Sequence, residues 1–218
     1  MLDLSLYVIL DPAQCAGRST KSAAEAAIMG GATLLQYRDK TASTRAMVEN
    51  AAVILKMAKR HGVPLLVNDR VDVALAVKAD GVHLGQDDMP IDMARAMLGE
   101  DAIIGLTLKT AQDIDTAPIE LIDYGCIGGV FATKSKQNET EPLGLNGLHA
   151  MIDHVRRLDG DLPLDAIAGI DAANAASVIG AGANGIAVLS AVTKANDPKS
   201  AAAELKSIVM SAKRGRAA

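Results

Sequence analysis

The stretch LLVNDRVDVALAVKADGVHLGQDD, residues 65–88, decides the fold of this chain. It contains two short apolar runs, at 65–67 and 81–84, separated by a segment long enough for one short helix. An order of strand, helix and strand is typical of a βαβ unit, which lays its two strands parallel and side by side. Polar residues follow both runs directly, so we expect both polar groups to lie at the same rim of a parallel sheet.

The same pattern recurs along the whole chain. Runs rich in Val, Ile and Leu alternate with Ala- and Met-rich segments such as 44–61, whose apolar residues recur at three- and four-residue steps. Because the runs are apolar on both faces, the predicted sheet must be covered by helices. Eight runs are predicted as strands: 4–10, 33–37, 65–67, 81–84, 103–106, 124–130, 164–168 and 185–189.

Eight βα units in a chain of 218 residues indicate one α/β domain, a closed (β/α)8 TIM barrel over residues 1–212. A doubly wound open sheet is the alternative that the pattern leaves open. Small residues precede three of the runs, at Gly31, Gly81 and Gly185, and we expect these glycines to end helices in the left-handed region. In a barrel, the functional groups lie on the loops that follow the strands.

Composition argues against several classes of partner. A net charge of −4 and a pI near 5.5 do not suit a general nucleic-acid binder, which needs clustered Lys and Arg. The basic cluster of the chain lies in the tail 213–218, which we expect to be disordered. The apolar run at 4–10 is too short for a membrane span or a signal peptide, so we expect a cytoplasmic protein without a membrane partner. Apolar outer helix faces leave a homo-oligomer open.

Two sequence features are set aside. Cys15 and Cys126 have neither the spacing nor the neighbours of a disulfide framework or a zinc site, so both are expected to be small hydrophobic residues. Gly180, Gly182 and Gly185 match G-x-G-x-x-G, but they follow a predicted helix and precede a predicted strand, the reverse of the dinucleotide-binding order. We therefore interpret this glycine-rich stretch as a helix end and a turn.

Three polar residues alternate at the end of the second predicted strand: Gln36, Arg38 and Lys40. Because successive side chains of a strand point to opposite faces, these three can point to one side. Arg grips phosphate oxygens through its guanidinium fork and Lys adds a mobile point charge, so the cluster is typical of a polyanion site. A set of salt bridges at the strand end is the structural alternative.

Acidic residues follow the next two strands, as Asn68-Asp69 and Asp87-Asp88. Carboxylates from neighbouring strand ends can hold one Mg²⁺ together with phosphate oxygens and water. Helix capping is the alternative, because Asn and Asp favour that position and helices are expected to begin shortly after both pairs. His83, a lone histidine in an apolar run, is more typical of a satisfied structural group than of a general base.

A polar segment at 132–144, too long for a plain connection, follows the sixth predicted strand and is typical of a lid at a barrel mouth. Donors for a second phosphate come from this segment and from the ends of the last two strands, where many barrels bind phosphate: Thr133, Ser135, Lys136, Gly169, Leu189 and Ser190. These residues alone indicate a Mg²⁺-dependent barrel enzyme that acts on a diphosphate and a second phosphate-bearing substrate.

Seven strings, in order, resemble the thiamine-phosphate synthase family over nearly the whole chain: QYRDK (36–40), LLVNDR (65–70), ADGVHLGQDD (79–88), IIGLT (103–107), GGVFATKSK (128–136), AIAGI (166–170) and GIAVLSAV (185–192). The resemblance implies a (β/α)8 barrel that joins hydroxymethylpyrimidine diphosphate to a thiazole phosphate or its carboxylate. It implies a transferase that uses Mg²⁺ and releases pyrophosphate. The implied mechanism is dissociative, with Mg²⁺ and the cations stabilising the departing pyrophosphate.

The resemblance also implies roles for individual residues. Contacts to the pyrimidine diphosphate are expected from Gln36, Tyr37, Arg38, Asp39, Lys40, Asn68, Thr107 and Lys136, of which Arg38, Lys40 and Lys136 are the catalytic cations. The expected Mg²⁺ ligands are Asp69 and Asp88. Contacts to the thiazole phosphate are expected from Thr133, Ser135, Gly169, Leu189 and Ser190.

The chain departs from the usual family pattern at Thr107, Gly129, Ser135 and Ala168, where family members usually carry Ser, Pro, Thr and Gly. Two rival functions are open. A thiazole tautomerase of the same superfamily typically has His at the position of Gly129, and the intact cations and carboxylates of this chain favour the synthase. A sensor of thiamine precursors without catalytic activity has no need of two carboxylates aimed at a leaving group.

Overall fold

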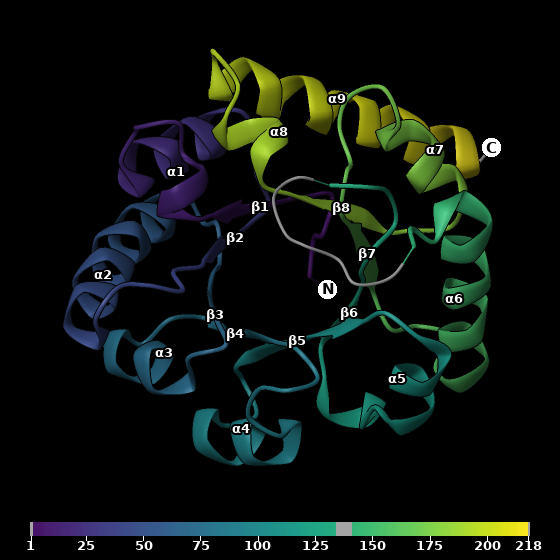
Figure 1. Cartoon of the computed structure of the whole chain (residues 1–218), viewed down its shortest axis with the longest axis horizontal. Coiled ribbons are helices and arrows are strands. Elements are labelled where there is room, and N and C mark those ends of the chain that lie inside the picture. Colours follow the sequence, from purple (N-terminus) through teal and green to yellow (C-terminus); the bar gives the residue numbers. More distant parts are fainter. Residues whose placement is uncertain (1, 134–140, 218) are drawn as a thin grey trace.

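A computed structural model describes residues 2–133 and 141–217. Within these residues, eight parallel strands form a closed barrel, with β8 paired back to β1 and helices around it as an outer ring (Figure 1). The strands are β1 (Leu6–Leu10), β2 (Leu34–Tyr37), β3 (Leu65–Asn68), β4 (Gly81–Leu84), β5 (Ile103–Leu108), β6 (Tyr124–Ile127), β7 (Leu164–Ile167) and β8 (Gly185–Val188). The helices are α1 (Thr20–Met29), α2 (Thr44–Arg60), α3 (Val71–Val77), α4 (Ile91–Leu98), α5 (Ala111–Thr116), α6 (Gly144–Leu158), α7 (Ala175–Gly180), α8 (Ser190–Thr193) and α9 (Pro198–Ala217), with short 3-10 helices at Pro12–Gln14 and Ile119–Leu121.

The closed barrel confirms the predicted fold, and the open sheet is wrong. All eight predicted runs contain a strand, and the differences lie at the ends. β6 and β7 stop at Ile127 and Ile167, before the predicted ends, because Gly129 and Ala168 take φ of +78° and +93° and leave the extended conformation. β5 continues to Leu108, two residues beyond its predicted end.

The helix predicted at 44–61 shows how the local sequence specifies these elements. The Ser43 side chain accepts a hydrogen bond from the backbone N–H of Ala46 and caps the first turn. The helix ends at Arg60, and His61 is its C-cap. Its buried residues are those that recur at helical spacing in the sequence: Met47, Ala51, Ile54, Leu55 and Ala58. This apolar face packs against the barrel.

The core has two parts. The larger part lies between the strands and the helices. The smaller part fills the inside of the barrel with Leu4, Tyr7, Leu34, Leu66, Tyr124, Cys126 and Ala187. Gly105 makes room for the Tyr124 ring, because a Cβ at this position would lie 2.0 Å from that ring. The barrel is therefore a packed core beneath its mouth and not an open channel.

The prediction for the three repeated glycines is correct at one position and wrong at two. Gly31 follows α1 with φ of +96°, in the left-handed region. Gly81 and Gly185 instead begin β4 and β8. A Cβ there would lie 1.8 Å from the carbonyl oxygen of Ile103 and 1.7 Å from that of Leu4, so these glycines allow neighbouring strands to approach.

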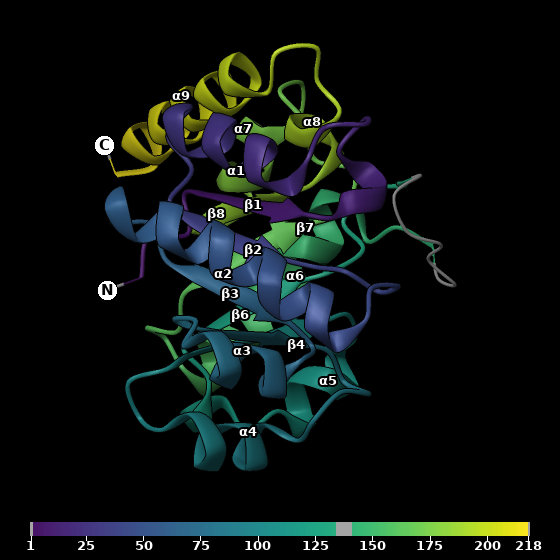
Figure 2. The same ribbon diagram turned by 90° about the vertical axis from the view of Figure 1, so that its left-hand side faces the viewer.

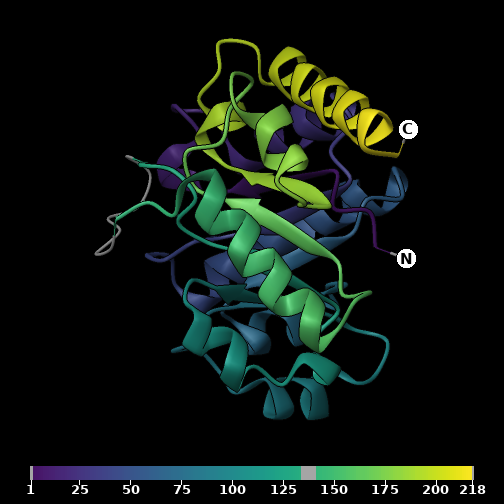
Figure 3. The same ribbon diagram turned by 90° about the vertical axis from the view of Figure 1, so that its right-hand side faces the viewer.

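The predicted disorder of the tail 213–218 is wrong for its described part, because α9 continues to Ala217. Lys213 donates a hydrogen bond to the Ser5 hydroxyl, and Arg216 donates to the carbonyl oxygens of Ile179 and Ala183. Figures 2 and 3 show α9 running over the outer layer and ending on the same side of the barrel as the N-terminus. Across residues 2–133 and 141–217, no helix is long and apolar enough to cross a membrane.

Candidate functional site

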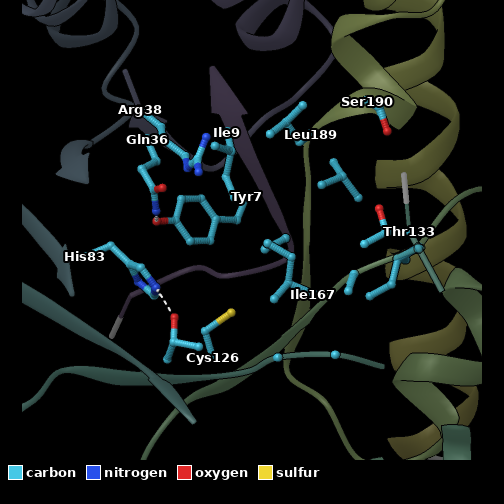
Figure 4. A pocket seen from close by; sticks show the side chains of 18 of the residues that line it. Tyr7, Ile9, Gln36, Arg38, His83, Cys126, Thr133, Ile167, Leu189 and Ser190 are labelled. Carbon is cyan, nitrogen blue, oxygen red and sulfur yellow. Dashed lines mark hydrogen bonds between the residues drawn. The ribbon is translucent and has the colours of Figure 1, made fainter. Parts of the chain in front are cut away.

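A pocket lies at the mouth of the barrel, where the strands end. Each strand contributes to its wall, through Ile9, Gln36, Asn68, His83, Thr107, Cys126, Ile167 and Ala187. Figure 4 shows Gln36, Arg38 and His83 on one side of the Tyr7 ring, with Thr133 and Ser190 on the other. The predicted gathering of polar groups at one rim is therefore confirmed for the described residues. A pocket with two polar sides can hold two ligands next to each other.

The cationic side of the pocket is built on the end of β2. Gln36 and Arg38 line the pocket, as their alternation predicted. The Arg38 guanidinium pairs with the buried carboxylate of Asp11, and the Lys40 ammonium pairs with Asp69. The salt bridges of the structural alternative are therefore present as well. These carboxylates hold both cations close to the place where an anion would bind.

Asp69 and Asp88 come together from the ends of β3 and β4. Asp69 takes a left-handed φ of +60°, and its carboxyl group interacts directly with that of Asp88. Asp88 also accepts a hydrogen bond of 2.7 Å from the backbone N–H of Gly85. Burial raises the pKa of Asp88, and the neighbouring Asp69 raises this pKa further. Two carboxyl groups that interact directly repel each other when both are charged, and a cation bound between them would relieve this repulsion.

The helix-capping alternative for these acidic residues is wrong. Arg70 and Pro90 occupy the N-cap positions of α3 and α4, and neither helix has a side-chain cap. The described residues contain no cluster of three or more His, Cys, Asp or Glu side chains arranged to hold a metal ion. The two carboxylates nevertheless fit Mg²⁺, which is usually bound by one or two carboxylates and completes its octahedral shell with water and phosphate oxygens.

Three of the described residues expected at the diphosphate do not line the pocket: Tyr37, Asp39 and Lys40. Tyr37 is buried on the helix side of β2, where its hydroxyl donates to Asp39 at 3.2 Å and accepts from Asn50 of α2. Burial raises the pKa of Tyr37 to about 12. The Asp39 carboxylate accepts hydrogen bonds from the backbone N–H groups of Thr41 and Ala42 and shapes the turn after β2. The strand alternation that brings Gln36 and Arg38 inward directs Tyr37 outward.

A chain of hydrogen bonds crosses the pocket floor from Gln36 to Thr107. Gln36 and Tyr124 both donate to the Tyr7 hydroxyl, and the Tyr124 hydroxyl is 2.7 Å from Nδ1 of His83. Nε2 of His83 is 2.7 Å from the Thr107 hydroxyl (Figure 4). His83 is therefore held on both ring nitrogens, as the structural interpretation predicted. It sets the orientation of the Thr107 hydroxyl at the pocket wall.

The second polar side comes from the ends of β7 and β8 and from Thr133. Gly169, Leu189 and Ser190 all line the pocket. Gly169 has φ of +66°, and a Cβ at this position would lie 2.5 Å from the carbonyl oxygen of Ala132. These four predicted residues are thus brought together. The two further predicted residues Ser135 and Lys136, and the central part of the predicted lid, lie outside the described residues.

Sequence reasoning missed several residues of this pocket, among them Tyr7, Lys109, Cys126 and Ile167. Three of these four lie inside apolar runs and read as ordinary core residues. Strand alternation offered the signal, because Tyr7 and Ile9 share one face of β1 and Cys126 pairs in register with Thr107 of β5. Lys109 follows β5 directly and adds a cation to the wall.

Comparison with known proteins agrees with this geometry. The family model described as thiamine monophosphate synthase matches residues 6–192 of the chain. The chain belongs to the thiamine monophosphate synthase family. The matched region contains all eight strands and every predicted site residue of this family member.

Individual relatives of this thiamine monophosphate synthase family member extend over nearly its full length. The thiamine-phosphate synthase of Chloroflexus aurantiacus is 48% identical, covering 96% of this chain and 94% of that protein. The thiamine-phosphate synthase of Agrobacterium fabrum is 46% identical, covering 99% and 98%. A solved structure, thiamine phosphate pyrophosphorylase from Pyrococcus furiosus, superposes with a TM-score of 0.85 at 36% identity and covers 97% of this chain and 98% of that one.

Proposed function

We propose that this chain is a thiamine-phosphate synthase, a transferase that moves a pyrimidinylmethyl group from its diphosphate to a thiazole phosphate or its carboxylate. One observation carries the proposal. In a chain of this family, the paired carboxylates Asp69 and Asp88 lie beside the Lys40 ammonium at the strand ends, and Arg38 lines one side of a pocket that has a second polar side. This arrangement suits a diphosphate leaving group next to a second phosphate-bearing ligand.

On the diphosphate side, Arg38, Lys40 and Lys136 bind the phosphate oxygens, with Asn68 beside them. Arg38 exchanges its pairing with Asp11 for the ligand, and Lys40 does the same with Asp69. Gln36 and Thr107 bind the pyrimidine, and both are held in place by the hydrogen-bond chain through Tyr7, Tyr124 and His83. Because these hydrogen bonds are already formed, little side-chain ordering is required when the substrate binds.

On the acceptor side, Thr133, Gly169, Leu189 and Ser190 bind the thiazole phosphate, together with Ser135. Gly169 brings backbone close to Ala132, where a side chain would collide. Ala168 and Gly129 both line the pocket. Where family members usually carry Gly, Ala168 adds a methyl group to this wall, and where they usually carry Pro, Gly129 lacks the proline ring. The methyl group narrows the acceptor side, and the glycine widens it. We propose that the two changes offset each other and that a thiazole phosphate still fits.

The proposed reaction is dissociative. The bond between the pyrimidinylmethyl carbon and the diphosphate oxygen breaks, and its electron pair leaves with pyrophosphate. The thiazole nitrogen then donates its lone pair to the resulting cation and forms the new bond. Arg38, Lys40 and Lys136 stabilise the charge on the departing pyrophosphate, so catalysis is electrostatic and positional. Asp69 and Asp88 would hold Mg²⁺, which would supply further neutralisation of that charge.

A pyrophosphate-release assay tests the proposal. The protein is mixed with hydroxymethylpyrimidine diphosphate and either thiazole phosphate or its carboxylate, with Mg²⁺ or with chelator, and the product is identified by mass. We expect thiamine phosphate that depends on the metal. Tautomerised thiazole carboxylate without pyrophosphate would indicate the tautomerase, and tight binding of the diphosphate without any product would indicate a sensor.

A matched pair of variants tests the metal site. Asp88→Asn removes one proposed ligand and should raise the Mg²⁺ concentration needed for half-maximal rate by at least about tenfold. Asp87→Asn changes the neighbouring exposed carboxylate, which has no assigned role, and should leave this concentration unchanged. Equal behaviour of the two variants would refute Asp88 as a metal ligand.

A further inference from the structure

The interior of the barrel contains a carboxyl group that the proposed reaction has not used. Asp165 lies on β7 and is completely buried. Among the described residues, neither of its carboxylate oxygens makes a hydrogen bond of normal geometry, and the Cys126 thiol contributes only a weak interaction. Its backbone pairs in register with Cys126 of β6 and Gly185 of β8, in the middle of the sheet. Unpartnered acidic groups in a protein core are costly, and a side chain kept at such a cost requires an explanation.

Asp165 lies directly beneath the pocket. Ile167, two residues further along β7 and on the same face, lines the pocket floor. At the rise of a strand, this places Asp165 about 7 Å below that floor. The Cys126 thiol also lines the floor and interacts with Asp165 from β6. Only packed side chains and no bulk water separate the carboxyl group from a ligand in the pocket.

Among the described residues, no Lys, Arg or His side chain interacts with Asp165. In the described part of the chain, the titratable groups that interact with it are Tyr7 on β1 and Tyr124 and Cys126 on β6. Burial raises the pKa of all three, so they are uncharged at neutral pH. Burial also raises the pKa of Asp165 to about 7, and the Cys126 thiol lowers it in part. Asp165 therefore gains its negative charge around neutral pH.

The described residues that line the pocket include the cations Arg38 and Lys109 and no carboxylate. These cations suit the departing pyrophosphate, but they oppose the positive charge that the proposed mechanism creates on the pyrimidinylmethyl carbon. A negative charge below the floor acts on that carbon through a medium of low dielectric constant, where electrostatic interactions are strong and hardly screened by salt.

We propose that the ionised Asp165 carboxylate, buried beneath the pocket floor, stabilises the pyrimidinylmethyl cation while it waits for the thiazole nitrogen. The inference rests on the proposed function. Asp165 does not touch the substrate, so it is a positioning residue that sets the electric field at the pocket through the packed floor. Its interaction is made in the transition state and not with the neutral ground-state pyrimidine, so it raises kcat and leaves KM unchanged.

A purely structural role makes the opposite prediction about stability. If Asp165 only held the barrel together, its replacement would lower activity and stability together. In the proposed role the ionised carboxylate destabilises the core, so a neutral replacement makes the protein more stable above neutral pH and slower. Asp165→Asn is well suited to separate these cases, because Asn has nearly the shape of the protonated acid and cannot ionise.

The experiment measures kcat and KM for both substrates from about pH 6 to 9, together with urea unfolding at each pH, for the wild-type protein and Asp165→Asn. We expect the wild-type kcat to rise as Asp165 ionises. The variant should lack this rise, have about tenfold lower kcat at about pH 8, keep KM within about twofold and unfold at higher urea. If Asp165→Asn fails to fold, Asp165→Val, which replaces the carboxyl group with an apolar side chain, is measured in its place with the same expected results.

Three outcomes would overturn the inference. Coinciding kcat profiles of variant and wild type would show that the charge has no effect on the reaction. Lower stability of both variants at about pH 8 would show that Asp165 is a structural residue. A wild-type protein that forms no thiamine phosphate, while the unfolding data still show a carboxyl group titrating near neutral pH, would locate the failure in the proposed function and remove the inference with it.

Discussion

Ala168 and Gly169 form a pair of neighbouring positions at which opposite substitutions should have opposite effects on stability. Ala168 holds φ of +93°, a region that non-glycine residues rarely adopt. Its carbonyl oxygen accepts a hydrogen bond of 3.0 Å from Phe131, which keeps the strained backbone in place. Strain of this kind costs about 1–3 kcal/mol. Glycine relieves it but loses about 0.5–1 kcal/mol through the greater freedom of the unfolded chain.

Ala168→Gly should therefore raise the free energy of unfolding by about 1 kcal/mol and the Tm by about 2–4 °C for a protein of this size. Gly169→Ala should act in the other direction. Its φ of +66° is unfavourable for alanine, and the new Cβ would lie 2.5 Å from the carbonyl oxygen of Ala132 and 2.7 Å from Cβ of Phe131. The loss should be about 2–4 kcal/mol, the sum of a backbone term and an overpacking term.

Urea unfolding at constant pH measures the change in unfolding free energy of each variant, and calorimetry then measures the change in Tm. The slope of the free energy against urea should be the same for all three proteins, so that the midpoints report stability directly. A less stable Ala168→Gly variant, or two variants that change stability in the same direction, would refute the account of strain at the end of β7.

Three further predictions concern other parts of the molecule. The pKa of Asp165 is about 7 in the folded protein and 3.8 in the unfolded chain, so the contribution of this group to stability is complete below about pH 4 and is lost as the pH rises through 7. Urea unfolding should show that the free energy of unfolding falls by about 4 kcal/mol between pH 4 and a pH above 7, and this fall should be absent in Asp165→Asn. Arg95 is buried and donates to several loop carbonyl oxygens and to the Asp123 carboxylate, so Arg95→Ala should lower the unfolding free energy by about 3–5 kcal/mol in the same measurement. Lys136→Ala should lower kcat at least about tenfold in the pyrophosphate assay, and an unchanged rate would contradict its proposed role.

The sequence was sufficient to predict the barrel because local and global signals agree. Apolar runs and helical segments alternate eight times, and each run contains a strand of the structure. The rim position of Gln36, Arg38, Asp69 and Asp88 follows from strand direction alone. These polar residues directly follow predicted strands, so the alternation of strands and helices indicated both the fold and the position of this half of the site.

The remaining errors have physical causes. The family resemblance implies a substrate contact for Tyr37, but strand alternation turns this side chain away from the pocket. Tyr7 and Tyr124 lie in apolar runs, and only the closed barrel brings their hydroxyl groups within 3.0 Å of each other. Asp165 was overlooked because a lone acidic residue in a run gives no indication of its partners. Such long-range contacts depend on barrel closure, which local patterns do not describe.

The closure of the barrel also affects how the protein can be made. β8 pairs with β1, and α9 packs across α1 and α7, so the first and last parts of the chain stabilise each other. During synthesis, the apolar edge of β1 is without its β8 neighbour until residues 185–188 have left the ribosome. Nascent chains of this protein should therefore remain sensitive to proteases and to chaperone binding until β8 has been synthesised, and the ring should close late because the contact joins distant segments.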